Sequence, residues 1–146
     1  MDFLRDNVES LIIIILGFMS FIVVVYTIER LYFYAKIKIE NYQSEEELEV
    51  LLTKNLTTLY IIYSNAPYIG LLGTVAGIMI TFYDMGMAGG GVDAKSIMIG
   101  MSLALKATAA GLLVAIPTLM IYNAFSRKVE VILAKFRIEH EKKLKA

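Results

Sequence analysis

The chain has 146 residues, which is room for one domain, and its composition is that of a membrane protein. Apolar residues make up 58% and charged residues 19%, whereas a soluble domain has about 45–50% and about a quarter. The net charge of +0 argues against nucleic-acid binding through bulk positive charge. The lack of Cys excludes thiolate metal sites and cysteine nucleophiles, and the single His140 lies in a charged tail. We therefore predict no enzyme activity, no metal site and no cofactor.

The first uncharged stretch, Leu11 to Ile28, has 18 residues. That is enough to cross a hydrocarbon core of about 30 Å at about 1.5 Å per residue. A signal peptide would instead need a basic start and a small-residue cleavage site. The chain begins with Asp2, Arg5 and Asp6, and no such site follows. We therefore predict that residues 11–28 form a transmembrane helix of the mature protein.

The second uncharged stretch runs from Leu59 to Tyr83 and contains Pro67. Proline lacks an N–H group and disfavours helix in the residue before it. This predicts a kink or a restart of the helix near Ala66, so that the membrane part of the second span is residues 66–83.

The third stretch, residues 96–126, is 31 residues long, and Lys106 is its only charged residue. At about 1.5 Å per residue it is longer than the hydrocarbon core, which predicts that it tilts or protrudes. Pro117 lies inside it and predicts a bend.

Basic residues outside the spans predict the orientation. Eleven Lys and Arg lie either between spans one and two or after span three. Only two lie before span one or between spans two and three. Basic loops stay in the cytoplasm. The N-terminus is therefore predicted to lie outside the cytoplasm and the C-terminus inside it.

Two further helices are predicted on the cytoplasmic side. Ser44 and Glu47 have the spacing of a capping box, and leucines at helical spacing follow them. This predicts one helix over about residues 45–64 that leads into span two, and a second over about 127–146 that continues span three. The predicted fold is all-α: a single polytopic membrane domain with three transmembrane helices, of which helices two and three are long and extend into the cytoplasm.

Small residues form a stripe along span two and another along span three. In lipid, such stripes let helices approach closely and let Thr hydroxyls bond across the contact. Close packing of the spans against each other, or against a neighbouring subunit, would explain the glycines and alanines. The threonines either line a polar path or bond to carbonyls of their own helix. The residues are Gly70, Gly73, Thr74, Gly77 and Thr81 in span two, and Gly100, Ala104, Thr108, Gly111, Ala115 and Thr118 in span three.

Lys106 is predicted to be a charge buried in the membrane, about 14 Å along the third stretch. A charge near mid-membrane costs at least about 2.5–3.5 kcal/mol and usually faces protein or a watery cavity. Glu9, Glu29 and Asp84 lie at span ends, so no acid of the chain is expected at the depth of Lys106. We therefore predict that a partner brings the acid or that Lys106 faces a pore. A neutral lysine, or one bonded to carbonyls, is the alternative.

Two segments resemble the transmembrane signatures of the ExbB/TolQ/MotA family of proton-channel proteins. Residues 65–78, NAPYIGLLGTVAGI, are similar to the second signature. Residues 100–117, GMSLALKATAAGLLVAIP, followed by Tyr122 and Asn123, are similar to the third. The chain looks closest to the ExbB branch of the family, in a small form with short cytoplasmic regions.

The resemblance implies a role and partners. ExbB-like proteins form a pentamer in the bacterial inner membrane around the helices of ExbD, a single-span protein with an essential Asp. Proton flow through that complex drives motion that TonB passes to outer-membrane transporters. The family's pore threonines correspond to Thr74 and Thr108, and Thr81 extends the same stripe. Related proteins often carry Glu five residues before the second threonine, where this chain has Leu103.

Two other functions remain open at this stage. The chain could be a scaffold or assembly subunit that conducts nothing, in which case the stripes would be dry and fully packed. It could also be a TolQ-like subunit of an envelope-maintenance complex with a TolR-like partner.

Overall fold

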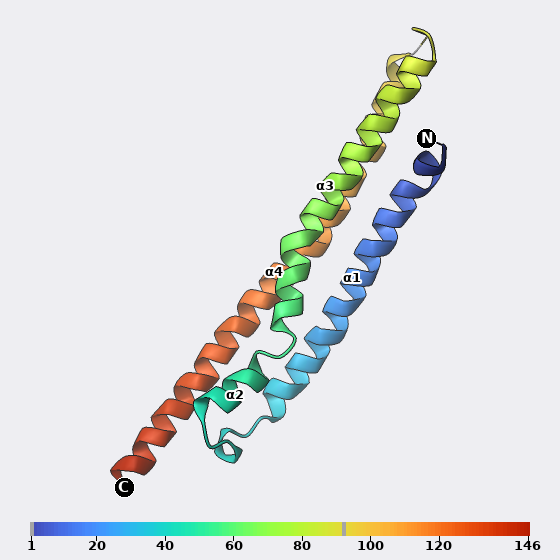
Figure 1. Ribbon diagram of the computed structural model, residues 1–146. Coiled ribbons are helices and arrows are strands. Elements are labelled where there is room, and N and C mark those ends of the chain that lie inside the picture. Colours follow the sequence, from blue (N-terminus) through green and yellow to red (C-terminus); the bar gives the residue numbers. More distant parts are fainter. Residues whose placement is uncertain (1, 92) are drawn as a thin grey trace.

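The computed structural model describes residues 2–91 and 93–146, and within them the chain is almost entirely helical (Figure 1). The described residues contain no strand, which confirms the prediction of an all-α fold. The elements are α1 (Asp2–Lys36), the 3-10 helix η1 (Ile39–Asn41), α2 (Glu45–Leu52), α3 (Leu56–Met87) and α4 (Ala94–Lys145).

Three of these helices are long and apolar enough to cross a membrane: Asp6–Lys36, Leu56–Met87 and Ala94–Lys145. Their most apolar 18-residue windows have mean hydropathies of 2.9, 1.5 and 1.8. The prediction of three long apolar helices is thereby confirmed. The exact ends of the membrane spans stay predictions.

The helices α3 and α4 form an antiparallel hairpin, and α1 lies along one side of it (Figure 1). The hairpin reaches well beyond the N-terminal end of α1, while α2 lies near the other end, beside the second half of α4. The turn between the hairpin helices contains Gly89 and Gly90, whose φ angles are 62° and 87°. Glycine adopts this left-handed conformation without steric cost. Asp93 then caps α4, because its carboxylate accepts the Ser96 N–H at 2.8 Å.

Both prolines lie inside continuous helices. The helix α3 begins at Leu56 and passes through Pro67 without the predicted restart at Ala66. Ala66 is fully buried, and its carbonyl lies against Gly111 of α4. Packing against α4 therefore holds the helix together where proline removes one backbone hydrogen bond. A bend at Pro67 or Pro117 stays a prediction.

The predicted helix over residues 45–64 is wrong as a single element, because α2 ends at Leu52 and α3 begins at Leu56. Its start is confirmed: the Ser44 hydroxyl accepts the Glu47 N–H at 3.2 Å. The break lies at Asn55, which has a left-handed φ of 68°. Asn tolerates this conformation better than most residues, so it permits a change of direction between the two helices.

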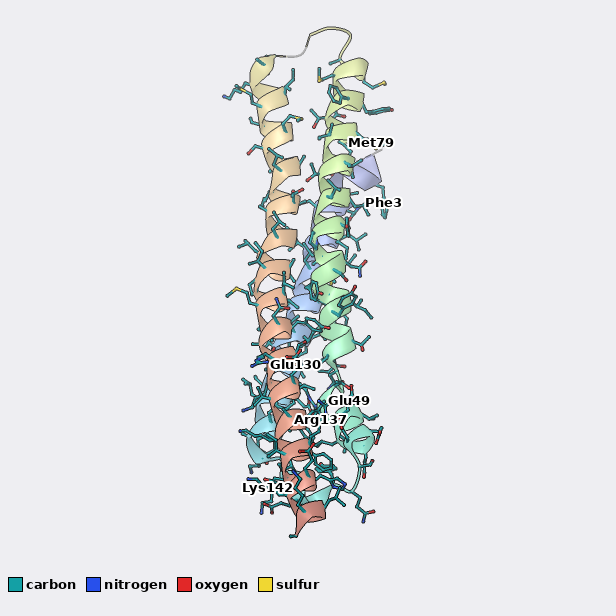
Figure 2. All side chains as sticks on the ribbon, turned by 90° about the vertical axis from the view of Figure 1, so that its left-hand side faces the viewer. Phe3, Glu49, Met79, Glu130, Arg137 and Lys142 are labelled. Carbon is teal, nitrogen blue, oxygen red and sulfur yellow. The ribbon has the colours of Figure 1, made fainter. Side chains whose placement is uncertain are left out.

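The end of the molecule near the C-terminus has its own apolar core. Leucines of α2 and of the first turns of α3 pack against the tail of α4, which explains why α4 continues past the third predicted span. The buried residues of this core are Val23, Tyr34, Leu48, Leu52, Leu56, Leu59, Ile62, Phe125, Val129, Ile132, Leu133 and Phe136. Charged side chains such as Glu130, Arg137 and Lys142 of α4 and Glu49 of α2 surround this end of the hairpin (Figure 2).

Candidate functional site

The two stripes of small residues face each other in the hairpin. A Cβ atom added at Gly70 would lie 2.6 Å from the Ala107 carbonyl oxygen, and one added at Gly111 would lie 2.6 Å from the Ala66 carbonyl oxygen. At this level the backbones of α3 and α4 touch directly. Since real Cβ atoms do not approach backbone atoms so closely, each glycine is required by the contact.

The close contact continues toward the turn of the hairpin. A Cβ atom at Gly73 would lie 2.6 Å from the Ala107 Cβ, and one at Gly77 would lie 2.7 Å from the Ala104 Cβ. A Cβ atom at Gly100 would meet the Thr81 hydroxyl at 2.5 Å. The structure therefore brings together the predicted packing residues of both helices; Ala115, farther along α4, is also buried.

Thr74 and Thr108 meet in the middle of this contact, and their hydroxyls are hydrogen-bonded to each other. The Thr74 hydroxyl donates to the Ala104 carbonyl of α4 at 2.8 Å. Its single proton is thereby engaged, so Thr108 is the donor in the bond between the two threonines. Thr74 is buried and Thr108 is half-buried. The lone pairs of the Thr108 hydroxyl consequently remain available to a group outside the hairpin.

The other stripe threonines bond within their own helices. The Thr81 hydroxyl donates to the Gly77 carbonyl at 2.9 Å, and the Thr118 hydroxyl donates to the Val114 carbonyl at 2.7 Å. Thr118 is only 1% exposed. Thr81, which sequence reasoning placed on a polar path, is half-buried and lines a cleft near the outer part of the hairpin.

That cleft has a volume of about 290 Å³ and lies between α1 and the hairpin. Its lining combines small residues of the stripes with the carboxylates of Glu9 and Asp84. Leu103, where the family resemblance implies Glu, lines the same cleft. The lining residues are Val8, Glu9, Gly73, Gly77, Ile80, Thr81, Asp84, Gly100, Leu103, Ala104 and Ala107. A carboxylate from α1, that of Glu9, therefore lines this cleft.

The expectation that no acid of the chain reaches Lys106 is wrong. The Lys106 ammonium donates to Glu9 Oε1 at 3.0 Å, and the two side chains are 61% and 44% exposed. The hairpin extends past the N-terminal end of α1 (Figure 1), so Lys106 lies level with the start of the apolar run of α1. Within this chain Lys106 is an exposed, ion-paired residue that fastens α1 to α4, and its acid does not have to come from a partner.

Arg30 is a buried charged residue that the sequence did not single out. It is 1% exposed, and its guanidinium donates to the Leu51 carbonyl at 2.7 Å and is paired with Glu29. The Tyr34 hydroxyl donates to the Leu52 carbonyl at 2.7 Å. The side chains of α1 thus satisfy the free carbonyls at the C-terminal end of α2. Glu29 also accepts the Asn55 side-chain amide at 3.1 Å, which ties α1 to the break before α3.

A second link joins α2 to the tail of α4. The Arg137 guanidinium donates to the Glu45 carboxylate, with Nε at 2.7 Å from Oε1. This hydrogen bond holds the pKa of the Glu45 carboxyl below its usual value.

Within the residues that the structure describes, no group of three or more His, Cys, Asp or Glu side chains has the geometry of a metal site.

Comparison with known proteins finds clear relatives. The profile of the MotA/TolQ/ExbB proton channel family matches residues 25–138. The chain is 56% identical over 138 residues to the biopolymer transport protein ExbB of Helicobacter pylori, and the match covers 94% of each chain. It is 47% identical over 129 residues to ExbB of Aquifex aeolicus, covering 88% of this chain and 86% of the relative. It is also 37% identical over 94 residues to the Tol-Pal system protein TolQ of Pseudomonas aeruginosa, a match that covers 38% of that protein.

Proposed function

The chain belongs to the MotA/TolQ/ExbB proton channel family, and we propose that it is the ExbB-type subunit of a proton-driven motor in the bacterial inner membrane. In this proposal five copies surround the helices of an ExbD-like single-span protein, and a TonB-like protein carries the motion to outer-membrane transporters. Two relatives named ExbB are 56% and 47% identical to this chain and match it over 86% or more of their length, whereas the TolQ relative is 37% identical over 94 residues. The ExbB-type role is therefore favoured over the TolQ-like one.

The orientation in this proposal rests on the distribution of charge. Eleven of the thirteen Lys and Arg outside the predicted spans lie at the end of the molecule that contains α2 and the tail of α4. Basic segments stay on the cytoplasmic side. In this proposal the N-terminus and the turn of the hairpin therefore lie in the periplasm.

The threonine pair is the observation that carries the proposal. A carboxylic acid on a partner helix would be neutral in an apolar environment, because burying the charged form there costs several kcal/mol. Its O–H group can donate to the lone pairs of the Thr108 hydroxyl, while Thr74 holds that hydroxyl in place. After the acid loses its proton, the Thr108 hydroxyl can turn and donate to the carboxylate. The pair therefore suits a carboxyl group that alternates between both states.

A substitution that removes one hydroxyl with little change of shape tests this role. Thr108→Val should lower TonB-dependent uptake of an iron chelate roughly tenfold or more, the cost of one hydrogen bond to an ionisable group. Thr108→Ser keeps the hydroxyl and should retain most of the uptake. Thr118→Val is the matched control, because that hydroxyl is buried and bonded within α4.

The assay is uptake by cells whose own copy of the gene is deleted, with each variant supplied at the same membrane abundance. Normal uptake by Thr108→Val would refute the role of the pair and favour a packing subunit. Normal uptake by the deletion strain itself would refute the proposed function.

A further inference from the structure

A groove rich in lysine lies between the end of α1 and the tail of α4, on the side proposed to be cytoplasmic. Its volume is about 410 Å³, and pockets of about 300–1,000 Å³ hold small ligands. Lys38, which follows α1, and Lys128 and Lys135 of α4 line this lysine groove. Among the described residues that line it, Glu40 is the one acid. The groove therefore carries an excess of positive charge.

The protein does not neutralise these three lysines. In the part of the chain that the structure describes, no carboxylate oxygen lies within 4.0 Å of the ammonium group of Lys38, Lys128 or Lys135. By contrast, Lys106 and Arg137 are each paired with an acid. An anion bound in the groove would supply the missing negative charge and relieve the repulsion between the ammonium groups.

The groove begins at the level where the third apolar stretch ends. The ring of Tyr34, which lines the groove, lies 5.4 Å from the ring of Phe125. The uncharged part of α4 ends one residue later, at Ser126. Lys128 follows Phe125 by three residues, about 4.5 Å along the helix axis. Since the headgroup layer adds about 5–8 Å to each side of the hydrocarbon core, Lys128 lies at the level expected for lipid phosphate groups.

The end of α1 marks the same edge of the membrane. Tyr32 is 62% exposed, and the Lys36 ammonium donates to its hydroxyl at 2.8 Å. Exposed tyrosines are typical of the membrane–water interface, and nearby lysines place their charge in the headgroup layer. Lys135 lies farther along α4, but side chains of a helix tilt toward its N-terminus, which is the direction of the membrane in α4. All three lysines of the groove are therefore suited to a ligand at the membrane surface.

The groove also has an apolar wall, which Ile37, Ile39 and Ile132 provide. A free phosphate ion would gain nothing from this wall. The glycerol and the first acyl carbons of a lipid would bury apolar surface against it. In the turns of α1 that precede the groove, Ile28 and Leu31 are 63% and 56% exposed, as expected of a helix in contact with acyl chains.

We propose that the lysine groove binds the headgroup of an anionic phospholipid from the cytoplasmic leaflet. The phosphate oxygens accept hydrogen bonds from the ammonium groups of Lys38 and Lys128, and Lys135 adds positive charge at the outer edge. Basic pockets between transmembrane helices on the cytoplasmic side bind such headgroups. The bound lipid ties the end of α1 to the tail of α4. This inference goes beyond the proposed function and does not depend on proton conduction.

The test measures lipid binding by the purified full-length chain in a nonionic detergent. Phosphatidylglycerol is titrated in, and the bound lipid is counted by native mass spectrometry. Phosphatidylcholine with the same acyl chains is the lipid without net charge, and glycerol 3-phosphate supplies the phosphate without acyl chains. The groove variant combines Lys38→Gln, Lys128→Gln and Lys135→Gln. All three side chains are exposed, so the fold should be unchanged, which circular dichroism checks.

A matched control removes the same amount of charge elsewhere. The tail variant combines Lys142→Gln, Lys143→Gln and Lys145→Gln, which are exposed residues in the last turns of α4 and do not line the groove. A further variant with Arg in place of the three groove lysines keeps the positive charge.

Each basic residue at an anionic lipid surface contributes roughly fivefold to binding. The groove variant should therefore bind phosphatidylglycerol about a hundredfold more weakly, while the tail variant and the Arg variant stay close to the parent. Phosphatidylcholine and glycerol 3-phosphate should bind the parent at least about tenfold more weakly than phosphatidylglycerol. Phosphatidylglycerol should also raise the unfolding temperature of the parent but not that of the groove variant, because a ligand of the folded state stabilises it.

Three results would overturn the inference. Undiminished binding by the groove variant would reject the site, and equal losses in the groove and tail variants would show that lipid responds only to overall charge. Glycerol 3-phosphate that binds as tightly as phosphatidylglycerol would assign the groove to a soluble phosphate compound instead of a lipid. A chain that binds phosphatidylglycerol as expected but conducts no protons would support this inference and refute only the proposed function.

Discussion

Adding a single methyl group at Gly111 tests the geometry of the hairpin contact. In Gly111→Ala the new Cβ would lie 2.6 Å from the Ala66 carbonyl oxygen and 3.1 Å from the Gly70 Cα. Both neighbours are backbone atoms of α3, so no side-chain rotation can relieve the overlap. The two helices must move apart, which also disturbs the nearby bond between Thr74 and Thr108.

The size of the effect follows from two opposing contributions. Alanine is favoured over glycine inside a helix by about 0.5–1 kcal/mol. Overpacking a close contact costs about 1–3 kcal/mol, and a clash between backbones belongs in the upper part of that range. We expect Gly111→Ala to lower the free energy of unfolding by about 1–2 kcal/mol. Gly17→Ala is the matched control: a Cβ there meets nothing within 4 Å, so it should leave stability unchanged or raise it by up to about 1 kcal/mol.

The free energy of unfolding of both variants would be measured by denaturant titration in detergent micelles, with helix content followed by circular dichroism. We predict that the parent is more stable than Gly111→Ala and that Gly17→Ala is at least as stable as the parent. A Gly111→Ala protein as stable as Gly17→Ala would show that α3 and α4 do not touch at this level, and the site built on their contact would have to be abandoned.

Three further predictions concern charged residues. In a double-mutant cycle, Lys106→Met and Glu9→Gln should show a coupling energy of about 0.2–1 kcal/mol, because both side chains are about half exposed; zero coupling would reject the ion pair. Arg30→Met should lower the free energy of unfolding by about 1–3 kcal/mol by leaving carbonyls of α2 without a donor, and stability equal to the parent would reject the buried network. The lowered pKa of the Glu45 carboxyl means that its bond to Arg137 stabilises the fold above the usual carboxyl pKa and is lost as the pH falls through the lowered value. Glu45→Gln should remove that part of the pH dependence of thermal unfolding, and an unchanged pH profile would contradict the link.

The helical spacing of small residues predicted the hairpin contact well. In lipid, glycine and alanine at every third or fourth position have little reason to occur except close packing. The spacing placed Gly70 and Gly111 on contact faces but left open whether these faces meet each other or a neighbouring subunit; in the structure each glycine lies against the other helix. The same pattern could not decide what the threonines do, because a Thr hydroxyl can bond within its helix, as Thr81 does, or across to another, as Thr74 does.

The relative position of the helices could not be read from the sequence. The length of each apolar stretch is visible, but the level at which α1 packs against the hairpin is not. Lys106 was therefore expected at a depth that no acid of the chain reaches, whereas it lies level with Glu9. The burial of Arg30 could not be predicted for the same reason, and the residue was grouped with the other basic residues between spans one and two. Its burial depends on the carbonyls at the end of α2, and the break at Asn55 that exposes them is a tertiary feature.

Proton conduction by the intact complex tests the central claim most directly. The full chain and its co-purified single-span partner would be reconstituted in liposomes, and proton uptake would be recorded with an enclosed dye under an imposed potential. The proposed function predicts a flux that requires both proteins, falls in Thr108→Val and persists in Thr118→Val. A complex that assembles fully but takes up protons no faster than empty liposomes would contradict it.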